Sequence, residues 1–252
     1  MNDLNLESEN RENAKIIGLF LSKFDRMALE IMGFKSYAEA FNVISLAINI
    51  NINSIKNYRD EYDPYLSTKR KGWRNRPMRV NAEDIYFRYK DFEFNELYNI
   101  VKSIIIGNVR LDTNDDNQAI ISNNNHFANR LIAGKASENF FRNNYENIEI
   151  FNGFEMIDHT ELGSGYDFEL RKSNHKTKYI EVKGLGANNK SILMTDKEFK
   201  TAKNFGLDYY VFIVKNYNKS PEFQIYQNPT EILTFKKNQI IQTNWTTNLS
   251  LN

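Results

Sequence analysis

Two carboxylates and a lysine lie close together in the second half of the sequence, in GYDFELRKSNHKTKYIEVKG (165–184). Asp167 belongs to one run of alternating polar and apolar residues, and Glu181 and Lys183 belong to the next. Carboxylate oxygens are the ligands that hard cations such as Mg²⁺ prefer. A nearby lysine can orient or help deprotonate an attacking water and stabilise a pentacovalent phosphate. These residue types therefore predict metal-assisted chemistry on a phosphate ester.

The polar sequence SNHK (173–176) between the two runs predicts a β-hairpin. With the turn centred there, Asp167 lies opposite Glu181, and Phe168 lies opposite Ile180. Because side chains alternate between the faces of a strand, the hairpin has one charged and one apolar face. The charged face carries Asp167, Glu169, Tyr179, Glu181 and Lys183, and the apolar face carries Tyr166, Phe168, Leu170, Ile180 and Val182.

Two interpretations of the charged face remain open. Like charges directly opposite each other destabilise a sheet, so a bound divalent cation gives Asp167 and Glu181 a reason to be paired. The alternative is an amphipathic hairpin whose outer face is solvated and salt-bridged through Lys183. An Asp…Glu-x-Lys pattern is weak by itself, but Gly165 and Gly184 at the two ends and the order of the surrounding elements favour the site.

The first part of the chain is predicted to be all-helical, because no run with a period of two precedes residue 108. Gly33 is the expected C-cap of the first helix, Ser36 the N-cap of the second, and Pro64 the end of the third. The expected helices cover residues 11–33, 37–50, 54–63 and 93–106.

Residues 108–127 are polar and rich in Asn and Asp, which predicts a linker. A helix is expected at 128–145, and Thr195 should cap another, with Glu198 in the capping-box position. Strands are expected at 148–157, 166–171, 177–183, 191–194, 209–215, 222–226 and 236–242. The order α-β-β-β-α-β predicts an α/β (α+β) fold of two domains, with a helical region at 1–107 and a mixed-sheet core at 128–252.

With these residues in view, GYDFE…YIEVKG resembles the PD-(D/E)xK nuclease superfamily, in the branch with Gly-Tyr-Asp followed by (I/L)-E-V-K. This branch occurs in bacterial restriction and defence proteins. The resemblance covers about 128–216 and implies a restriction endonuclease-like core. It further implies that Asp167, Glu181 and the carbonyl of Val182 bind the metal and that Lys183 is catalytic. Tyr166 stands where the superfamily's name has proline, a departure common in the family.

A further metal ligand is left open between two glutamates. The resemblance implies a glutamate on the preceding helix, which here is Glu138 in GKASENFF. The alternative role for Glu138 is to complement the dipole of that helix. Glu169, on the charged face of the hairpin, is the rival or additional ligand.

The segment KRKGWRNRPMR (69–79) concentrates positive charge around a tryptophan. Such a segment suits a phosphate backbone, with the indole able to stack on a base or wedge between base steps. The alternative is a solvated loop that Trp73 anchors to the helical core. The expected nucleic-acid-binding residues are Lys69, Arg70, Lys71, Trp73, Arg74, Arg76 and Arg79.

Composition limits the class of protein. The 252 residues are 41% hydrophobic, enough for packed cores, and the formal net charge is +1, so affinity for nucleic acid must come from local patches. The absence of cysteine excludes disulfides and thiolate metal sites and fits a reducing compartment. The acidic N-terminus does not resemble a signal peptide, and IIGLFL is too short to span a membrane. We expect a cytoplasmic protein with no membrane partner.

Together these features predict an endonuclease of a restriction or phage-defence system that uses Mg²⁺, with Mn²⁺ as a substitute, and acts on double-stranded DNA. Cutting both strands requires two such sites, which predicts a homodimer. Two alternatives remain: a catalytically inactive nucleic-acid-binding or assembly subunit with the same fold, and a ribonuclease that uses the same residues.

Overall fold

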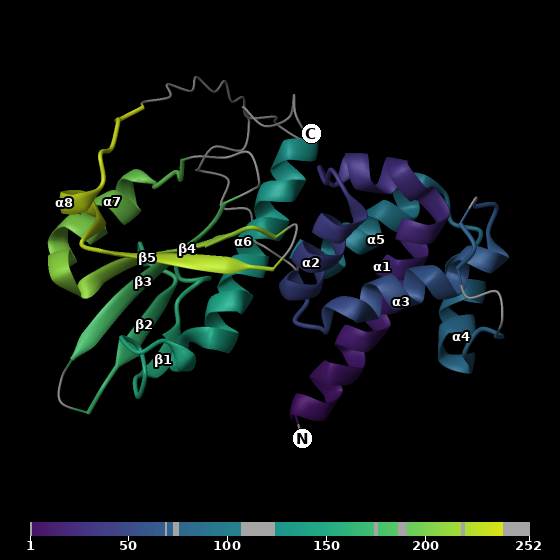
Figure 1. Cartoon of the computed structure of the whole chain (residues 1–252), viewed down its shortest axis with the longest axis horizontal. Helices are drawn as coiled ribbons and strands as arrows, with labels where there is room; N and C mark the ends of the chain where they lie inside the picture. Colours follow the sequence, from purple (N-terminus) through teal and green to yellow (C-terminus); the bar gives the residue numbers. More distant parts are fainter. Residues whose placement is uncertain are drawn as a thin grey trace, which may run out of the picture.

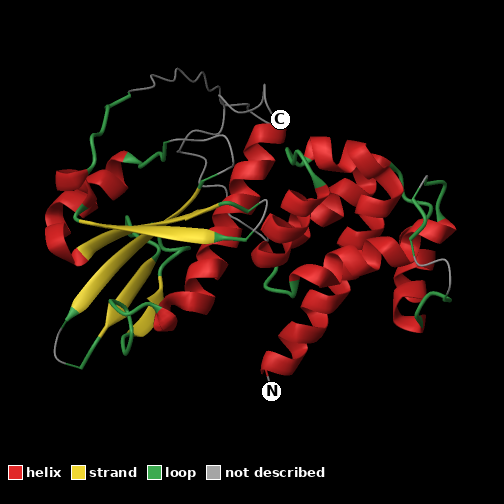
Figure 2. Cartoon of the chain, viewed as in Figure 1, coloured by secondary structure: helices red, strands yellow, loops and turns green. Residues whose placement is uncertain are grey.

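The computed structural model describes residues 2–68, 70–72, 76–106, 124–173, 176–185, 191–217 and 220–238. Helices make up the N-terminal part, and a five-stranded sheet with flanking helices makes up the rest (Figures 1 and 2). This is the α+β arrangement that the sequence predicts. No helix in the described ranges is both long and apolar enough to cross a membrane.

The N-terminal region is a bundle around α1, whose apolar residues Ile17, Phe20 and Leu21 are fully buried. The side chain of Ser36 accepts a hydrogen bond from the Glu39 N–H and so caps α2, as predicted. The helices are α1 (Asn2–Ile31), α2 (Tyr37–Ala47), α3 (Ile52–Tyr62), α4 (Val80–Tyr89) and α5 (Phe94–Ile106). Helix α4 was not predicted from the sequence, because it has only two buried residues, Ala82 and Ile85, and thus shows a weak helical period.

The sheet has the strand order β1-β2-β3-β4-β5, in which β3 and β4 are parallel and the other neighbours are antiparallel. Parallel strands need a crossover connection, and α7 provides it between β3 and β4. The order from α6 to β4 is the predicted α-β-β-β-α-β. The elements are α6 (Asn124–Asn144), β1 (Glu155–Asp158), β2 (Phe168–Arg171), β3 (Thr177–Gly184), α7 (Asp196–Phe205), β4 (Tyr209–Lys215), β5 (Glu222–Gln227) and the short α8 (Pro229–Ile232).

Several predicted boundaries were wrong. Helix α6 begins at Asn124, inside the predicted linker 108–127, so the polar composition of its first turn concealed its start. Residues 191–194 form no strand, and the strand expected at 148–157 is confined to β1, because tight turns occupy 148–153. The rest of the linker, 108–123, lies outside the described residues. The strand expected at 236–242 is absent from 236–238, and its remainder is also outside them.

Helices cover both faces of the sheet, and alternate residues of β4 point into two separate cores. Phe212 packs against Phe141 of α6 on one face, with ring centroids 4.9 Å apart. Val211 and Ile213 lie on the other face, in a smaller cluster with Ala202 of α7. The strand is therefore buried on both sides, as its nearly continuous apolar sequence indicates.

Helix α6 also packs against α2 of the N-terminal region (Figure 1). The side-chain amide of Asn139 donates to the carbonyl oxygens of Leu46 (2.9 Å) and Ala47 (3.0 Å), and Asn42 donates to the carbonyl of Tyr217. The larger buried apolar cluster runs without a break from the helical region into the sheet.

The predicted hairpin register is confirmed: Phe168 pairs with Ile180, and Glu169 pairs with Tyr179. The predicted assignment of side chains to the two faces of the hairpin is correct only for residues within the hydrogen-bonded strands. Tyr166 was placed on the apolar face with Phe168, but it packs against Tyr179 on the opposite side of the sheet. The reason is that β2 starts at Phe168, so the alternation of a strand does not extend back to Tyr166.

Candidate metal and phosphodiester site

Asp167 is fixed to β3 by its backbone and by its side chain. Its N–H donates to the carbonyl of Ile180 (2.9 Å), and its carboxylate accepts the N–H of Val182 (2.7 Å). The chain enters this position through Gly165, which has a φ of +87°. A Cβ at Gly165 would lie 2.4 Å from the hydroxyl oxygen of Thr201, so the turn requires glycine. Asp167 is thereby held beside Glu181.

Glu181 and Lys183 project from β3 on the same side of the sheet, because they are two residues apart. Glu181 is buried, and one of its carboxylate oxygens lies 2.5 Å from the Lys183 Nζ. The same ammonium lies 2.8 Å from a carboxylate oxygen of Glu198 on α7. Lys183 is therefore held between two carboxylates, one from the sheet and one from the crossover helix.

Glu198 belongs to the site, although the sequence predicted only a capping role for it. Its expected capping box is confirmed: the Glu198 N–H donates to the Thr195 hydroxyl (3.2 Å), and the Thr195 N–H donates to the Glu198 carboxylate (3.0 Å). The capping role accounts for a glutamate at this position, so nothing in the sequence indicated its contact with Lys183. Only the crossover geometry, in which α7 follows β3 and returns over it, brings the two side chains together.

Glu138 and Glu169, the two possible additional ligands, lie in different environments. Glu138 lines the same cavity as Asp167 and is 3.6 Å from the Nζ of Lys135. Glu169 is buried outside that cavity, where it pairs with Arg171 (2.5 Å) and His159 (3.3 Å). The structure therefore brings Glu138, and not Glu169, to the Asp167 site.

The site opens into a cavity of about 1000 Å³. Its wall is formed in part by the first turn of α7, through Glu198, by α6, by β3, by residues 191–194 and by residues 233–236. Its titratable lining comprises four carboxylates, two lysines and a tyrosine: Glu138, Asp167, Glu181, Glu198, Lys183, Lys236 and Tyr226.

The charges of this cluster are unbalanced. Burial raises the pKa of Asp167 to about 7, and the negative charge of Glu138 adds to that effect. Burial and the proximity of Asp167 raise the pKa of Glu181, and burial raises that of Glu138. Burial alone would lower the pKa of Lys183, but Glu181 and Glu198 outweigh it, so the pKa is raised. Lys183 is thus an ammonium ion surrounded by excess acidic groups.

This donor set fits a hard divalent cation, because it offers carboxylate oxygens with more negative charge than Lys183 neutralises. Val182, whose carbonyl the family resemblance implicates, lines the same cavity. Within the described part of the chain, no three acidic or histidine side chains lie close enough together to hold a metal ion. Glu181 is paired with Lys183 in this arrangement.

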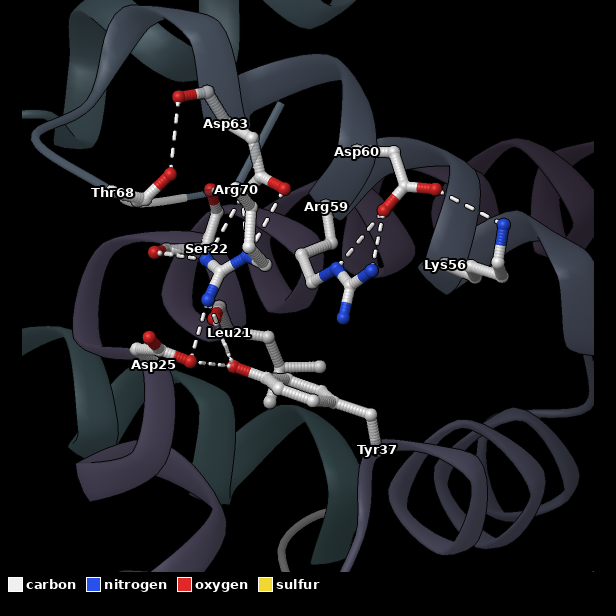
Figure 3. Close-up of polar contacts among 10 residues, drawn as sticks. All are labelled: Leu21, Ser22, Asp25, Tyr37, Lys56, Arg59, Asp60, Asp63, Thr68 and Arg70. Atoms are coloured by element: carbon white, nitrogen blue, oxygen red, sulfur yellow. Dashed lines mark hydrogen bonds and ion pairs between the residues drawn. The ribbon is translucent and has the colours of Figure 1, made fainter. Parts of the chain in front are cut away.

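Two arginines of the predicted nucleic-acid-binding segment, Arg70 and Arg79, form ion pairs in the helical region. Figure 3 shows the contacts of Arg70. The guanidinium of Arg70 contacts the buried carboxylate of Asp63 (2.9 Å) and that of Asp25 (2.5 Å). Arg79 makes a comparable pair with the buried Glu61 (2.5 Å). These two side chains fasten the segment to the C-terminal end of α3, to Asp63 just after it, and to Asp25 of α1.

The other predicted contacts divide into two groups. Lys71 and Arg76 are exposed, whereas Lys69, Trp73 and Arg74 lie outside the described residues. Gly72 lies between them at a φ of +51°, so close to α3 that a Cβ would lie 2.3 Å from the Asp60 carbonyl oxygen. The segment is therefore a loop anchored through Arg70, Gly72 and Arg79.

The fold and the site define an α+β protein with acidic groups and a lysine at a mixed sheet. Residues 137–226, about a third of the chain, match the family described as Protein NO VEIN, C-terminal. The matched region contains Glu138, Asp167, Glu181, Lys183 and Glu198. No curated protein and no solved structure matches the chain.

Proposed function

We propose that this protein is a Mg²⁺-dependent DNA endonuclease of a restriction or phage-defence system. The observation that carries the proposal is the arrangement of Asp167 and Glu181 beside Lys183 in an open cavity whose lining has more carboxyl groups than lysines. The resemblance of GYDFE…YIEVKG to PD-(D/E)xK nucleases supports the same chemistry, as does the α-β-β-β-α-β order around it.

Asp167 and Glu181 would hold the cation, with the carbonyl of Val182 and the carboxylate of Glu138 as further oxygen donors. When bound, a divalent cation supplies neutralisation of phosphate charge and lowers the pKa of water. Burial without enough nearby positive charge raises the pKa of Asp167 and Glu181. The same lack of positive charge would favour binding of a cation.

Lys183 would act on the phosphodiester as a cation. Because Glu181 and Glu198 raise its pKa, Lys183 is protonated in this arrangement and so is poorly suited to accept a proton from water. Its ammonium can donate hydrogen bonds to a non-bridging phosphate oxygen and orient the attacking water by its charge. Charge stabilisation of this kind counts most in a partly buried site.

Double-stranded DNA is the proposed substrate, and Lys71 and Arg76 on the anchored loop are its proposed phosphate contacts. Both side chains are exposed, and the overall charge of +1 leaves such local groups to supply the attraction. Since one site cuts one strand, a homodimer is proposed for cleavage of both.

The test is cleavage of circular and linear DNA and of RNA in Mg²⁺ or Mn²⁺, with wild type compared with Asp167→Asn and Lys183→Ala. Cleavage of DNA by wild type alone is expected, and it should stop when the cation is chelated. Equal cleavage by all three proteins would place the activity elsewhere. Cleavage of RNA alone would identify a ribonuclease, and DNA binding without cleavage would identify a binding or assembly subunit.

A further inference from the structure

The contact between α7 and the lysine of the site extends the proposed function, on which this inference rests. We propose that Glu198 is a positioning residue that keeps the Lys183 ammonium at the cavity when Glu181 is engaged elsewhere. Nothing in the motif GYDFE…YIEVKG contains Glu198, which lies beyond it in the helix after β3.

A bound cation and Lys183 would compete for the carboxylate of Glu181. Its carboxylate now contacts Lys183 at 2.5 Å. A carboxylate that also serves a divalent cation has less capacity to retain an ammonium, because the two positive charges repel each other. A lysine held by Glu181 alone would be free to swing out of the cavity. Lys183 therefore needs a second anchor to remain beside the phosphate.

Glu198 provides that anchor from a different element. Its Oε2 lies 2.8 Å from the Lys183 Nζ, and the side chains are only partly exposed, at 16% and 20%. A partly buried charged hydrogen bond is stronger than a surface ion pair. The ammonium can thus stay on Glu198 while Glu181 turns to another partner.

The capping box makes this anchor rigid. The same Oε2 of Glu198 that contacts Lys183 also accepts the backbone N–H of Thr195 (3.0 Å). A glutamate with a free side chain would lose rotamer entropy on holding a lysine, whereas this one is already ordered by the cap. The first turn of α7 therefore fixes the position of Lys183 relative to β3.

Three variants of that turn separate positioning from helix stability. Glu198→Gln keeps an oxygen for the cap but removes the charge that holds Lys183. Thr195→Ala removes the hydroxyl that accepts the Glu198 N–H and leaves the carboxylate in place. Asp196→Asn removes an equal charge from the same turn, but Asp196 is exposed and pairs with Lys200 instead.

With cleavage measured under saturating Mg²⁺, Glu198→Gln should lower kcat by about 10- to 100-fold while KM changes little, the size typical for loss of a group that orients a catalytic ligand. Asp196→Asn should keep kcat within about twofold of wild type after correction for folded fraction. Thr195→Ala keeps the Thr195 N–H on the Glu198 carboxylate and should lose less kcat than Glu198→Gln. An equal loss of kcat in Glu198→Gln and Thr195→Ala would show that Glu198 acts only as a cap and would overturn the proposal.

A second measurement needs no activity and no cation. Thermal unfolding of wild type, Lys183→Met, Glu198→Gln and the double variant forms a double-mutant cycle. We expect non-additive shifts in Tm, and additive shifts would overturn the inference. Non-additive shifts in a protein that cleaves neither DNA nor RNA would retain the anchor and reject the proposed nuclease function, so the two failures are distinguishable.

Discussion

The carboxylate of Asp167 accepts the backbone N–H of Val182 at 2.7 Å, although Asp167 lies outside the strand ladder. Val182 lies between Glu181 and Lys183, so this hydrogen bond joins the Asp167 side chain to the strand that carries the other two, and the Asp167 N–H makes a second bond to the same strand at Ile180. The position of Asp167 therefore depends on its side chain as well as on its backbone. Substitutions at Asp167 should separate its charge from its hydrogen bond.

Replacing Asp167 should change how stability depends on pH. The folded pKa of about 7 lies above the usual value for aspartate, so the folded chain binds the proton more tightly than the unfolded chain. Its contribution is thus fully present at low pH and is lost as pH rises from about 4 to 7. We expect Asp167→Asn to flatten this loss in urea unfolding between pH 4.5 and 8, whereas Asp167→Ala also loses the Val182 bond.

Magnesium should stabilise the folded protein more as the pH rises, whereas the contribution of protonated Asp167 decreases. If the carboxylates bind the cation, Mg²⁺ should raise the Tm of wild type more at pH 8 than at pH 5, because binding requires the ionised forms. Asp167→Asn should lose most of this shift. A Mg²⁺ effect of equal size in both proteins would locate cation binding at another part of the surface.

Arg70 should matter for folding more than for binding. Asp63 has only 1% of its side chain exposed, and Ser22 (2.5 Å) and Arg70 are among its partners. Arg70→Ala would leave a buried carboxylate without its cation, which costs about 3–5 kcal/mol. Urea unfolding measures the loss. Lys71→Ala, at the exposed neighbouring position, is the control and should change stability by about 0.5 kcal/mol or less.

Lys71 should instead affect DNA affinity in a salt-dependent manner. A lysine that contacts one phosphate contributes about one unit to the slope of log K against log salt concentration. Lys71→Ala should therefore reduce that slope by about one and weaken binding to all DNA sequences alike. Fluorescence anisotropy over a range of salt concentrations checks this. An unchanged slope would remove Lys71 from the interface.

Gly184 and Gly134 should respond differently to alanine. A Cβ on Gly184 would lie 2.6 Å from the Ser137 hydroxyl oxygen and 2.9 Å from the Ala133 carbonyl oxygen, where β3 meets α6. Gly184→Ala should therefore cost about 1–3 kcal/mol in unfolding. Gly134, in the interior of α6, has open space at its Cβ position, so Gly134→Ala should be neutral or stabilising by up to about 1 kcal/mol.

The hairpin and its register were predictable because a period of two is a local signal. The sequence placed Phe168 opposite Ile180 and put Glu181 and Lys183 on one face, and the structure confirms both. The same reasoning was wrong for Tyr166, where the chain leaves the ladder. A strand pattern contains no information on where the hydrogen bonds stop.

Long-range contacts were beyond such local patterns. The capping role of Glu198 was visible in the sequence, but its pairing with Lys183 was not, because the pairing depends on how α7 crosses the sheet. Likewise, the cluster of basic residues in 69–79 suggested that all of them face the solvent. Arg70 and Arg79 instead pair with the buried carboxylates of Asp63, just after α3, and of Glu61, in its last turn, and only the folded bundle reveals that these carboxylates are buried.

Helix α6 links the cavity rigidly to the N-terminal helical region. It carries Glu138 at the cavity and, one residue on, Asn139 hydrogen-bonded to the end of α2. If the helical region binds a duplex, as proposed, α6 would fix the spacing between that duplex and the acidic cluster. Cleavage would then fall at a set distance from the point of contact.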